Sequence, residues 1–209
     1  MKIVIVGGGT SGLVTAAIMQ NYWGDSVNIS LIYDPDNQSI GVGEGTTPSF
    51  IDVFNDTLGY TTEDAIRELD ATIKLGVLFK NWIPNEEYYH GFGQVTCDSS
   101  EQQNDDLSDN YSAFHSLLNN TYNGGVNWNK ANTLIPNKLT GYHYAFHITT
   151  DKLCNFLFDY LKDRVTLIPD VISRVTSDGK NIQSVTGKNT GNYHADLFVD
   201  ASGFKSILL

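Results

Sequence analysis

A run of glycines near the N-terminus constrains the fold more than any other feature of the sequence. Residues 7–12 read Gly-Gly-Gly-Thr-Ser-Gly and fit the pattern GxGxxG. The run follows a β-branched segment, Ile3 to Val6, and precedes residues 13–22, whose apolar residues suit a helix. Residues 28–33 form a second β-rich run. Strand, glycine turn, helix and strand in this order predict a βαβ unit of a Rossmann-like α/β fold.

Each glycine of the turn has a physical role in binding a dinucleotide. The first allows the tight turn after the strand, the second lets backbone amides approach a pyrophosphate, and the third lets helix and strand pack closely. The pyrophosphate would then lie at the helix N-terminus, where unpaired amides and the helix dipole favour negative charge. We therefore predict cofactor contacts from Gly7, Gly9, Thr10, Ser11 and Gly12. A glycine-rich turn without a ligand is the alternative interpretation.

An acidic residue about 20 residues beyond the turn should bind the ribose hydroxyls of the dinucleotide. Asp34, directly after the second β-rich run, is the natural candidate. Tyr33 is the residue that ends this run, so the identity of the ribose-binding residue stays open at this point.

The remainder of the chain indicates further helices and strands. Helices are predicted to begin at Pro48, at Thr62, which is a possible N-cap, and near Thr150 or Asp151. Residues 74–82 alternate like a strand. Residues 84–140 are rich in Asn, Asp, Tyr and Gly and predict an irregular insertion. Four short β-rich runs follow the last helix, at 165–168, 171–176, 182–186 and 192–198. The close spacing of turn residues between the last three predicts an antiparallel β-meander.

Composition and charge exclude several classes of function. The 209-residue chain has a formal net charge of -11 and its 13 Lys and Arg residues are scattered, so nucleic-acid binding is not expected. Cys97 and Cys154 lack CxxC spacing and the five histidines lack metal-ligand spacing, so we expect no metal site. No apolar run approaches the ~18 residues of a membrane span. The N-terminal apolar run is too short for a secretory signal, which predicts a soluble cytoplasmic protein.

Three further segments resemble one enzyme family. Residues 40–49, Ile-Gly-Val-Gly-Glu-Gly-Thr-Thr-Pro-Ser, are similar to the Ile-Gly-Val-Gly-Glu-Ala-Thr-x-Pro-Ser strap of flavin-dependent halogenases of the tryptophan-halogenase type. Residues 71–82 resemble the family segment that carries its essential lysine, which falls on Lys74. Residues 195–204 contain Asp-Ala-Ser-Gly-Phe, which is similar to a family element beside the flavin. The matches follow the family order and span nearly the whole chain.

The resemblance implies a two-component enzyme that uses FAD. A separate flavin reductase supplies the reduced FAD, oxygen converts it to a flavin hydroperoxide, and halide then forms hypohalous acid. This oxidant halogenates an electron-rich aromatic substrate such as tryptophan or an indole. Lys74 is the implied catalytic residue, because an ammonium donates hydrogen bonds to the oxidant and a desolvated amine can form a haloamine. From spacing alone, a lysine beside alternating apolar residues is an outward, solvated side chain.

The strap adds cofactor-binding candidates to those of the glycine turn. The resemblance assigns Ile40, Gly41, Val42, Gly43 and Glu44 to flavin contact and strap function, without a role in the chemistry. Glu44 has a simpler alternative role, as a carboxylate that accepts hydrogen bonds from loop amides.

The C-terminal element supplies two more candidates. Asp200, near the end of a predicted strand, is expected to bond the cofactor or the backbone, and Gly203 permits close approach of the cofactor. Family members continue well beyond this point, with a tryptophan-rich signature and a glutamate that cooperates with the lysine. The sequence ends on the apolar residues 207–209. We therefore expect one FAD/NAD(P)-binding Rossmann-like domain over residues 1–209, incomplete at its C-terminus.

Three functions fit these features. The first is a flavin-dependent halogenase, or its N-terminal part. The second is a non-catalytic flavin-binding fragment or subunit that needs a C-terminal companion chain or a homodimer. The third is another flavin monooxygenase, which hydroxylates its substrate without depending on halide.

Overall fold

The computed structural model describes residues 1–36, 43–85, 87–92, 125–126 and 144–209. It divides the chain into two compact units. Unit 1 comprises Met1–Val42, Thr57–Gly59 and Thr149–Leu209, and unit 2 comprises Gly43–Asp56 and Tyr60–Ile148.

Two of the predicted segments fall largely or wholly outside the described residues. They are most of the insertion expected at 84–140 and the strap residues Ile40, Gly41 and Val42.

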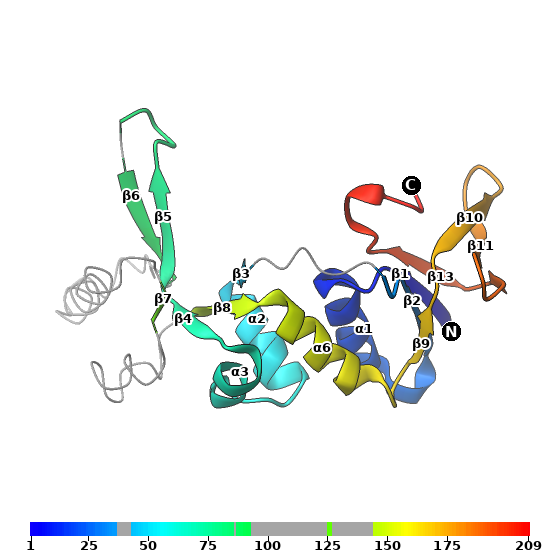
Figure 1. Ribbon diagram of the computed structural model, residues 1–209, viewed down its shortest axis with the longest axis horizontal. Helices are drawn as coiled ribbons and strands as arrows, with labels where there is room; N and C mark the ends of the chain where they lie inside the picture. Colours follow the sequence, from blue (N-terminus) through cyan, green and yellow to red (C-terminus); the bar gives the residue numbers. More distant parts are fainter. Residues whose placement is uncertain (37–42, 86, 93–124, 127–143) are drawn as a thin grey trace, which may run out of the picture. The chain divides into compact units, whose positions relative to one another are not determined.

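A parallel sheet forms the centre of unit 1, in the strand order β13-β1-β2-β9 (Figure 1). Its strands are β1 (Lys2–Val6), β2 (Asn28–Tyr33), β9 (Thr166–Pro169) and β13 (Leu197–Asp200). β1 runs parallel to both of its neighbours, with Ile5 beside Leu31 and Val199. Every residue of β1 except Lys2 is buried, as expected for a β-branched strand in a parallel sheet covered on both faces. The predicted α/β fold and its βαβ unit are confirmed.

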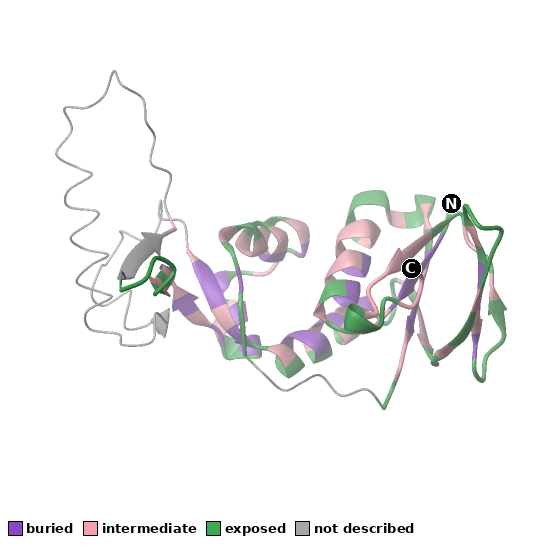
Figure 2. Cartoon of the chain, turned by 90° about the horizontal axis from the view of Figure 1, so that it is seen from above, coloured by how far each residue is buried: buried purple, intermediate pink, exposed green. Residues whose placement is uncertain are grey.

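Two helices, α1 (Thr10–Trp23) and α6 (Thr150–Leu161), lie side by side in unit 1 (Figure 1). Each buries one face, made of Gly12, Leu13, Ala16 and Ala17 in α1 and of Leu153, Cys154, Leu157 and Leu161 in α6. Spacings of three and four residues put these side chains on one side of each helix, and Figure 2 shows the buried residues gathered there and in the sheet. A 3-10 helix, η1 (Gly24–Ser26), follows α1. No helix in the described parts of the chain is long and apolar enough to cross a membrane.

The predicted meander is present as an antiparallel sheet in the order β10-β11-β12. Its strands are β10 (Ile172–Ser177), β11 (Ile182–Gly187) and β12 (Asn192–Tyr193). Val185 of β11 joins Val4, Val6 and Ile32 of the parallel sheet in one buried cluster. The meander therefore packs on the face of the parallel sheet to which these side chains point.

The prediction of one strand over 192–198 is wrong, because this run contains two strands from different sheets. β12 ends at Tyr193 on the edge of the meander, and β13 begins at Leu197 beside β1. Asp196 lies between them and bonds Lys2 twice: its amide donates to the Lys2 carbonyl oxygen at 2.9 Å, and its carboxylate accepts the Lys2 amide at 2.7 Å. These bonds direct the chain onto the free edge of β1.

Unit 2 contains a second sheet, in the order β3-β8-β4-β7, and a two-stranded hairpin of β5 and β6. The strands are β3 (Gly43–Gly45), β4 (Thr72–Lys74), β5 (Gly76–Lys80), β6 (Glu87–Gly91), β7 (Gly125–Val126) and β8 (Ala145–Thr149). The helical segments that the structure describes in this part of the sequence are α2 (Pro48–Asp52), the π-helix η2 (Val53–Thr57) and α3 (Thr62–Leu69). α2 starts at Pro48 as predicted, where a missing amide is harmless.

Two predictions in unit 2 need correction. The strand expected over 74–82 is divided, because β4 ends at Lys74 in the sheet, whereas β5 pairs with β6 in a separate hairpin. The N-cap of α3 is Thr61, one residue before the predicted Thr62, because Thr61 forms a capping box with Asp64.

Candidate functional site

The glycine turn joins β1 to α1, and its backbone is packed too tightly for side chains at the first and third glycines of the GxGxxG pattern. Gly7 has φ +124°, which L side chains rarely adopt, and a Cβ there would lie 2.1 Å from the Ala201 carbonyl oxygen. A Cβ on Gly12 would lie 1.9 Å from the Gly7 carbonyl oxygen. The first and third glycines therefore let the turn, the chain after β13 and the start of α1 pack against one another.

Gly9, the second glycine, faces open space, since no atom of the surrounding structure lies within 4 Å of a Cβ built there. Gly9 is the N-cap of α1 and has no side chain to bond the first helical amides, and the first turn of α1 contains no acidic residue. The amides of Thr10, Ser11 and Gly12 lie in this turn, where an α-helix provides no intrahelical acceptor. With the positive end of the helix dipole, these amides suit an anionic group such as a pyrophosphate.

A cavity of about 580 Å³ lies beside the glycine turn, at the carboxyl ends of β1 and β2. Polar lining residues from the strand ends and from α6 are Asp34, Asp151, Asn155, Asp170, Ser202 and Lys205. Open parallel α/β sheets bind their ligands at this edge. The cavity is therefore the candidate cofactor site of unit 1.

Asp34 and Tyr33 both line this cavity, but in different ways. The Tyr33 ring packs against Phe158 of α6, with ring centroids 4.8 Å apart. Asp34 follows β2 directly, and its Oδ1 accepts a hydrogen bond from the Asp36 amide at 3.1 Å. A carboxylate accepts hydrogen bonds from ribose hydroxyls, so Asp34 stays the predicted ribose-binding residue.

Asp200 ends β13 and organises the turn that follows it. Its Oδ1 accepts hydrogen bonds from the Ser202 amide at 3.0 Å and hydroxyl at 2.5 Å, and its Oδ2 accepts one from the Leu208 amide at 2.8 Å. Burial by itself raises the pKa of Asp200, but the hydrogen bonds from Ser202 and Leu208 together lower it below its ordinary value. Asp200 was expected to bond either the cofactor or the backbone, and its bonds to the Ser202 and Leu208 amides are backbone contacts. Gly203 has φ +66° in the same turn, and its contact with a cofactor stays a prediction, as does that of Asp200.

Lys74 lies at the end of β4 in unit 2, and its ammonium contacts two groups of the described part of the chain. Nζ donates a hydrogen bond to the Thr46 carbonyl oxygen at 3.0 Å and lies 5.3 Å from the centroid of the Phe92 ring. The side chain is half-buried, and this burial lowers the pKa of Lys74. Lys74 is therefore not the fully solvated side chain that its spacing alone suggests. Thr46 and Phe92 were not among the predicted site residues.

The described end of the strap, residues 43–45, lies close to Lys74. Gly43 and Glu44 are exposed on β3, and Gly45 follows them on the same strand. A Cβ on Gly45 would lie 3.1 Å from Lys74 Nζ. The structure therefore brings the end of the strap beside the lysine, whereas contacts of Gly43 and Glu44 with a flavin stay predictions.

Comparison with known protein families identifies the family of this chain. The family model described as tryptophan halogenase matches residues 2–209, which is nearly the whole chain. The chain belongs to the tryptophan halogenase family. Membership confirms the family predicted from the sequence.

Individual halogenases match along the whole chain. Tryptophan 7-halogenase RebH from Lentzea aerocolonigenes is 28% identical over 241 residues, which cover 100% of this chain and 43% of RebH. Tryptophan 6-halogenase SttH from Streptomyces toxytricini is 30% identical over 237 residues, which cover 100% of this chain and 45% of SttH.

Solved halogenase structures share the fold. The crystal structure of SttH matches with a TM-score of 0.74, covering 99% of this chain and 45% of that chain. Tar14, a tryptophan C-6 flavin-dependent halogenase (chlorinase) from taromycin biosynthesis, also gives 0.74 at 29% identity, covering 100% of this chain and 44% of that chain. The chain therefore spans less than half the length of these halogenases.

Asp170 is a buried carboxylate of this halogenase-family chain that the sequence analysis missed. It follows β9, lines the cavity of unit 1, and is 2% exposed. Its oxygens accept hydrogen bonds from the amides of Val171 at 2.8 Å, Asn189 at 3.0 Å and Thr190 at 2.8 Å, and from the Thr190 hydroxyl. The Thr190 hydroxyl and these amides hold the pKa of Asp170 well below its ordinary value of 3.8. Asp170 thus ties the turn between β11 and β12 to the wall of the cavity.

Asp170→Asn is expected to lower the Tm of unit 1 by on the order of 5 °C at pH 7, because a neutral amide cannot accept these bonds as a carboxylate does. Since the folded-state pKa is depressed, the stabilisation is present above pH 3.8 and is lost as pH falls through the folded-state value. The difference in Tm between wild type and variant should therefore be constant from pH 7 to about pH 5 and shrink in acid. Thermal unfolding followed by circular dichroism measures it. Asp178→Asn, in an exposed turn, is the control and should have a smaller effect.

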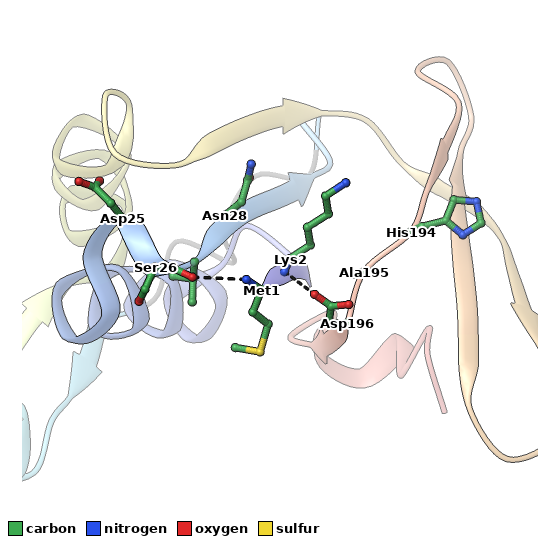
Figure 3. Close-up of a pocket in the computed structure, with 9 residues that line it drawn as sticks. Met1, Lys2, Asp25, Ser26, Asn28, His194, Ala195 and Asp196 are labelled. Carbon is green, nitrogen blue, oxygen red and sulfur yellow. Dashed lines mark hydrogen bonds between the residues drawn. The ribbon is translucent and has the colours of Figure 1, made fainter.

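A second cavity, of about 780 Å³, lies at the opposite end of the parallel sheet in this halogenase-family fold (Figure 3). Its lining includes Met1, Lys2, Asp25, His194 and Asp196. The backbone groups there bond one another, as in the contact of the Met1 amine with the Ser26 carbonyl oxygen at 3.3 Å. Because this is the amino end of the strands, it is not the edge at which parallel α/β sheets bind cofactors.

Proposed function

We propose that this chain is the cofactor-binding and lysine-bearing part of a FAD-dependent halogenase for an electron-rich aromatic substrate of the tryptophan or indole class. The observation that carries the proposal is the placement of Lys74, half-buried and bonded to Thr46, in a chain that matches the halogenase family throughout. RebH and SttH, at 28% and 30% identity, are a tryptophan 7-halogenase and a tryptophan 6-halogenase.

The glycine turn fits the diphosphate of FAD. The open space at Gly9 and the first turn of α1 would hold the pyrophosphate, and Asp34 would bind the ribose. Gly43 and Glu44 of the strap, with Asp200 and Gly203, are proposed as further flavin contacts. Reduced FAD, supplied by a separate flavin reductase, would activate oxygen so that halide is oxidised to hypohalous acid.

Lys74 would act on the hypohalous acid. Its ammonium donates a hydrogen bond to the oxygen of the oxidant, which makes the halogen more electrophilic toward the aromatic ring. Its neutral amine can instead take up the halogen as a haloamine, with release of water. Burial lowers the pKa of Lys74 and so increases the fraction of neutral amine at a given pH.

The remaining partners and the location are part of the same proposal. We infer a cytoplasmic protein that works with a flavin reductase. A C-terminal companion chain or a homodimer is proposed as a further partner. A flavin monooxygenase that hydroxylates its substrate is the second candidate, and its reaction would not depend on halide.

A halide-dependence assay tests the proposal. The chain is mixed with FAD, a flavin reductase with NADH, bromide and indole or tryptophan, and the products are analysed by mass spectrometry. We expect a brominated product that disappears when bromide is omitted. A hydroxylated product with or without bromide would support the monooxygenase. Flavin binding without any product, with or without a second chain that supplies the remaining length, would contradict halogenase activity.

A further inference from the structure

The ammonium of Lys74 forms a hydrogen bond with Thr46, which lies beyond the neighbouring strand β8. The sheet order is β3-β8-β4, Lys74 on β4 pairs with Ala145 on β8, and Thr46 directly follows β3. The lysine side chain therefore crosses β8 to reach the Thr46 carbonyl oxygen. Residues directly opposite in an antiparallel pair point to the same face, so the lysine stem passes over the small Ala145 side chain.

Thr46 is fixed to β8 by two hydrogen bonds with one residue. Its amide donates to the Phe146 carbonyl oxygen at 2.8 Å, and its hydroxyl accepts the Phe146 amide at 2.9 Å. Thr46 is 8% exposed and Phe146 is fully buried, so water does not readily replace either bond. The Thr46 hydroxyl thus accepts the Phe146 amide in place of a backbone carbonyl oxygen, at a position just beyond the end of β3. The two hydrogen bonds with Phe146 hold the Thr46 carbonyl in place.

Gly45 has no side chain, and the Lys74 ammonium lies in the space that a side chain there would occupy. A Cβ at Gly45 would be 3.1 Å from Lys74 Nζ and 3.4 Å from His147 Nδ1. Among the side chains that the structure describes on β3, β8 and β4, His147 and Glu44 are the other titratable groups. β7 contains Gly125 and Val126. A side chain at Gly45 would press on the ammonium, while the bonds between Thr46 and Phe146 would remain.

We propose that Thr46 is a positioning residue for Lys74. The hydrogen bond from the Phe146 amide to the Thr46 hydroxyl fixes Thr46 on β8. The Thr46 carbonyl oxygen then accepts the hydrogen bond that keeps the Lys74 ammonium beside the Phe92 ring. The proposal rests on the proposed function for the chemistry of Lys74, but the positioning can be measured without flavin, halide or substrate.

Competitive acetylation of the lysines tests the positioning. The full chain is treated with trace acetic anhydride from pH 7 to pH 11, and mass spectrometry of its peptides gives the rate at each lysine, with the exposed Lys80 as internal reference. Thr46→Val removes the hydroxyl but keeps the shape. Because the released ammonium regains water, the midpoint of the Lys74 profile should rise toward the ordinary value of 10.5. Thr46→Ser keeps the hydroxyl and should keep the wild-type profile.

Thr62→Val is the matched control. Thr62 is also a buried threonine of unit 2, at 6% exposure. Its hydroxyl forms a hydrogen bond with the Tyr144 hydroxyl at 2.6 Å, whereas the carbonyl of Thr46 binds Lys74. We expect it to leave the Lys74 profile unchanged. An equal shift in the Thr46→Val and Thr62→Val variants would show general loosening of unit 2 and overturn the proposal. An unchanged profile in folded Thr46→Val would overturn it as well.

Gly45→Ala decides the question if Thr46→Val does not fold. It retains the Thr46 and Phe146 bonds and displaces the ammonium from the carbonyl, so acetylation of Lys74 relative to Lys80 should fall at least about twofold. An unchanged rate overturns the proposal. If the labelling results are as expected but the chain makes no halogenated product, the proposed function is refuted and the positioning role of Thr46 stands. If the chain makes halogenated product but the labelling of Lys74 does not change in the variants, only the positioning role is refuted.

Discussion

Lys74→Ala is expected to lower the yield of halogenated product by on the order of 10²–10⁴-fold, or about 3–5 kcal/mol of transition-state stabilisation. The change removes the only lysine that the resemblance assigns to the oxidant. FAD affinity should stay within about twofold of wild type, because the described contacts of Lys74 are with Thr46 and Phe92, neither of which is proposed to bind FAD. Product is measured by chromatography under conditions in which the wild type forms brominated indole.

The pH dependence separates the two roles of Lys74. Burial lowers the pKa of Lys74 below its ordinary value of 10.5. If the ammonium acts as hydrogen-bond donor, product formation falls as pH rises through this lowered pKa. If the neutral amine takes up the halogen, product formation rises over the same range. Lys80→Ala removes one charge from the exposed end of β5 and serves as control. Equal product from the Lys74→Ala variant and wild type would remove Lys74 from the mechanism.

The parts of the fold that depend on local sequence were predicted well. β1, the glycine turn and β2 follow one another within a short stretch, so residue type and spacing were sufficient. The division of 192–198 between β12 and β13 was not predictable, because Val4 on β1, far away in the sequence, pairs with Phe198. Pairing between distant segments decides where such a strand begins.

The contacts of the candidate site show the same limit. Lys74 was identified from the residues around it, yet its acceptor Thr46 is 28 residues away and reaches it only through the strand order β3-β8-β4. Asp170 was missed because its donors lie 19 and 20 residues further on, in Asn189 and Thr190. One signal was present: Gly187 and Gly191 flank that turn, and a Cβ on Gly187 would collide with Asp170.

Gly7→Ala is expected to unfold unit 1 or to destabilise it by at least about 2–3 kcal/mol, out of a typical total of about 5–15 kcal/mol. Alanine disfavours φ +124°, and its Cβ would lie 2.1 Å from the Ala201 carbonyl oxygen, which belongs to the backbone and cannot turn aside. Thermal unfolding followed by circular dichroism measures the loss. A Gly7→Ala variant as stable as wild type would contradict the close packing between the turn and the chain after β13.

Gly9→Ala is the matched change that separates the fold from cofactor binding. Gly9 has φ -80° and ψ -179°, an extended conformation that alanine adopts, and a Cβ there meets no neighbouring atom within 4 Å. The variant should keep its Tm within a few degrees, because alanine adopts this conformation and restricts the unfolded chain but is a poorer N-cap than glycine. Its methyl group would, however, occupy the space through which a pyrophosphate approaches the amides of α1, so the Kd for FAD should rise at least about tenfold, or 1.4 kcal/mol. Fluorescence titration with FAD measures this. If Gly9→Ala bound FAD as wild type does, the pyrophosphate would have to lie elsewhere, and the open space at Gly9 would be only a feature of the turn.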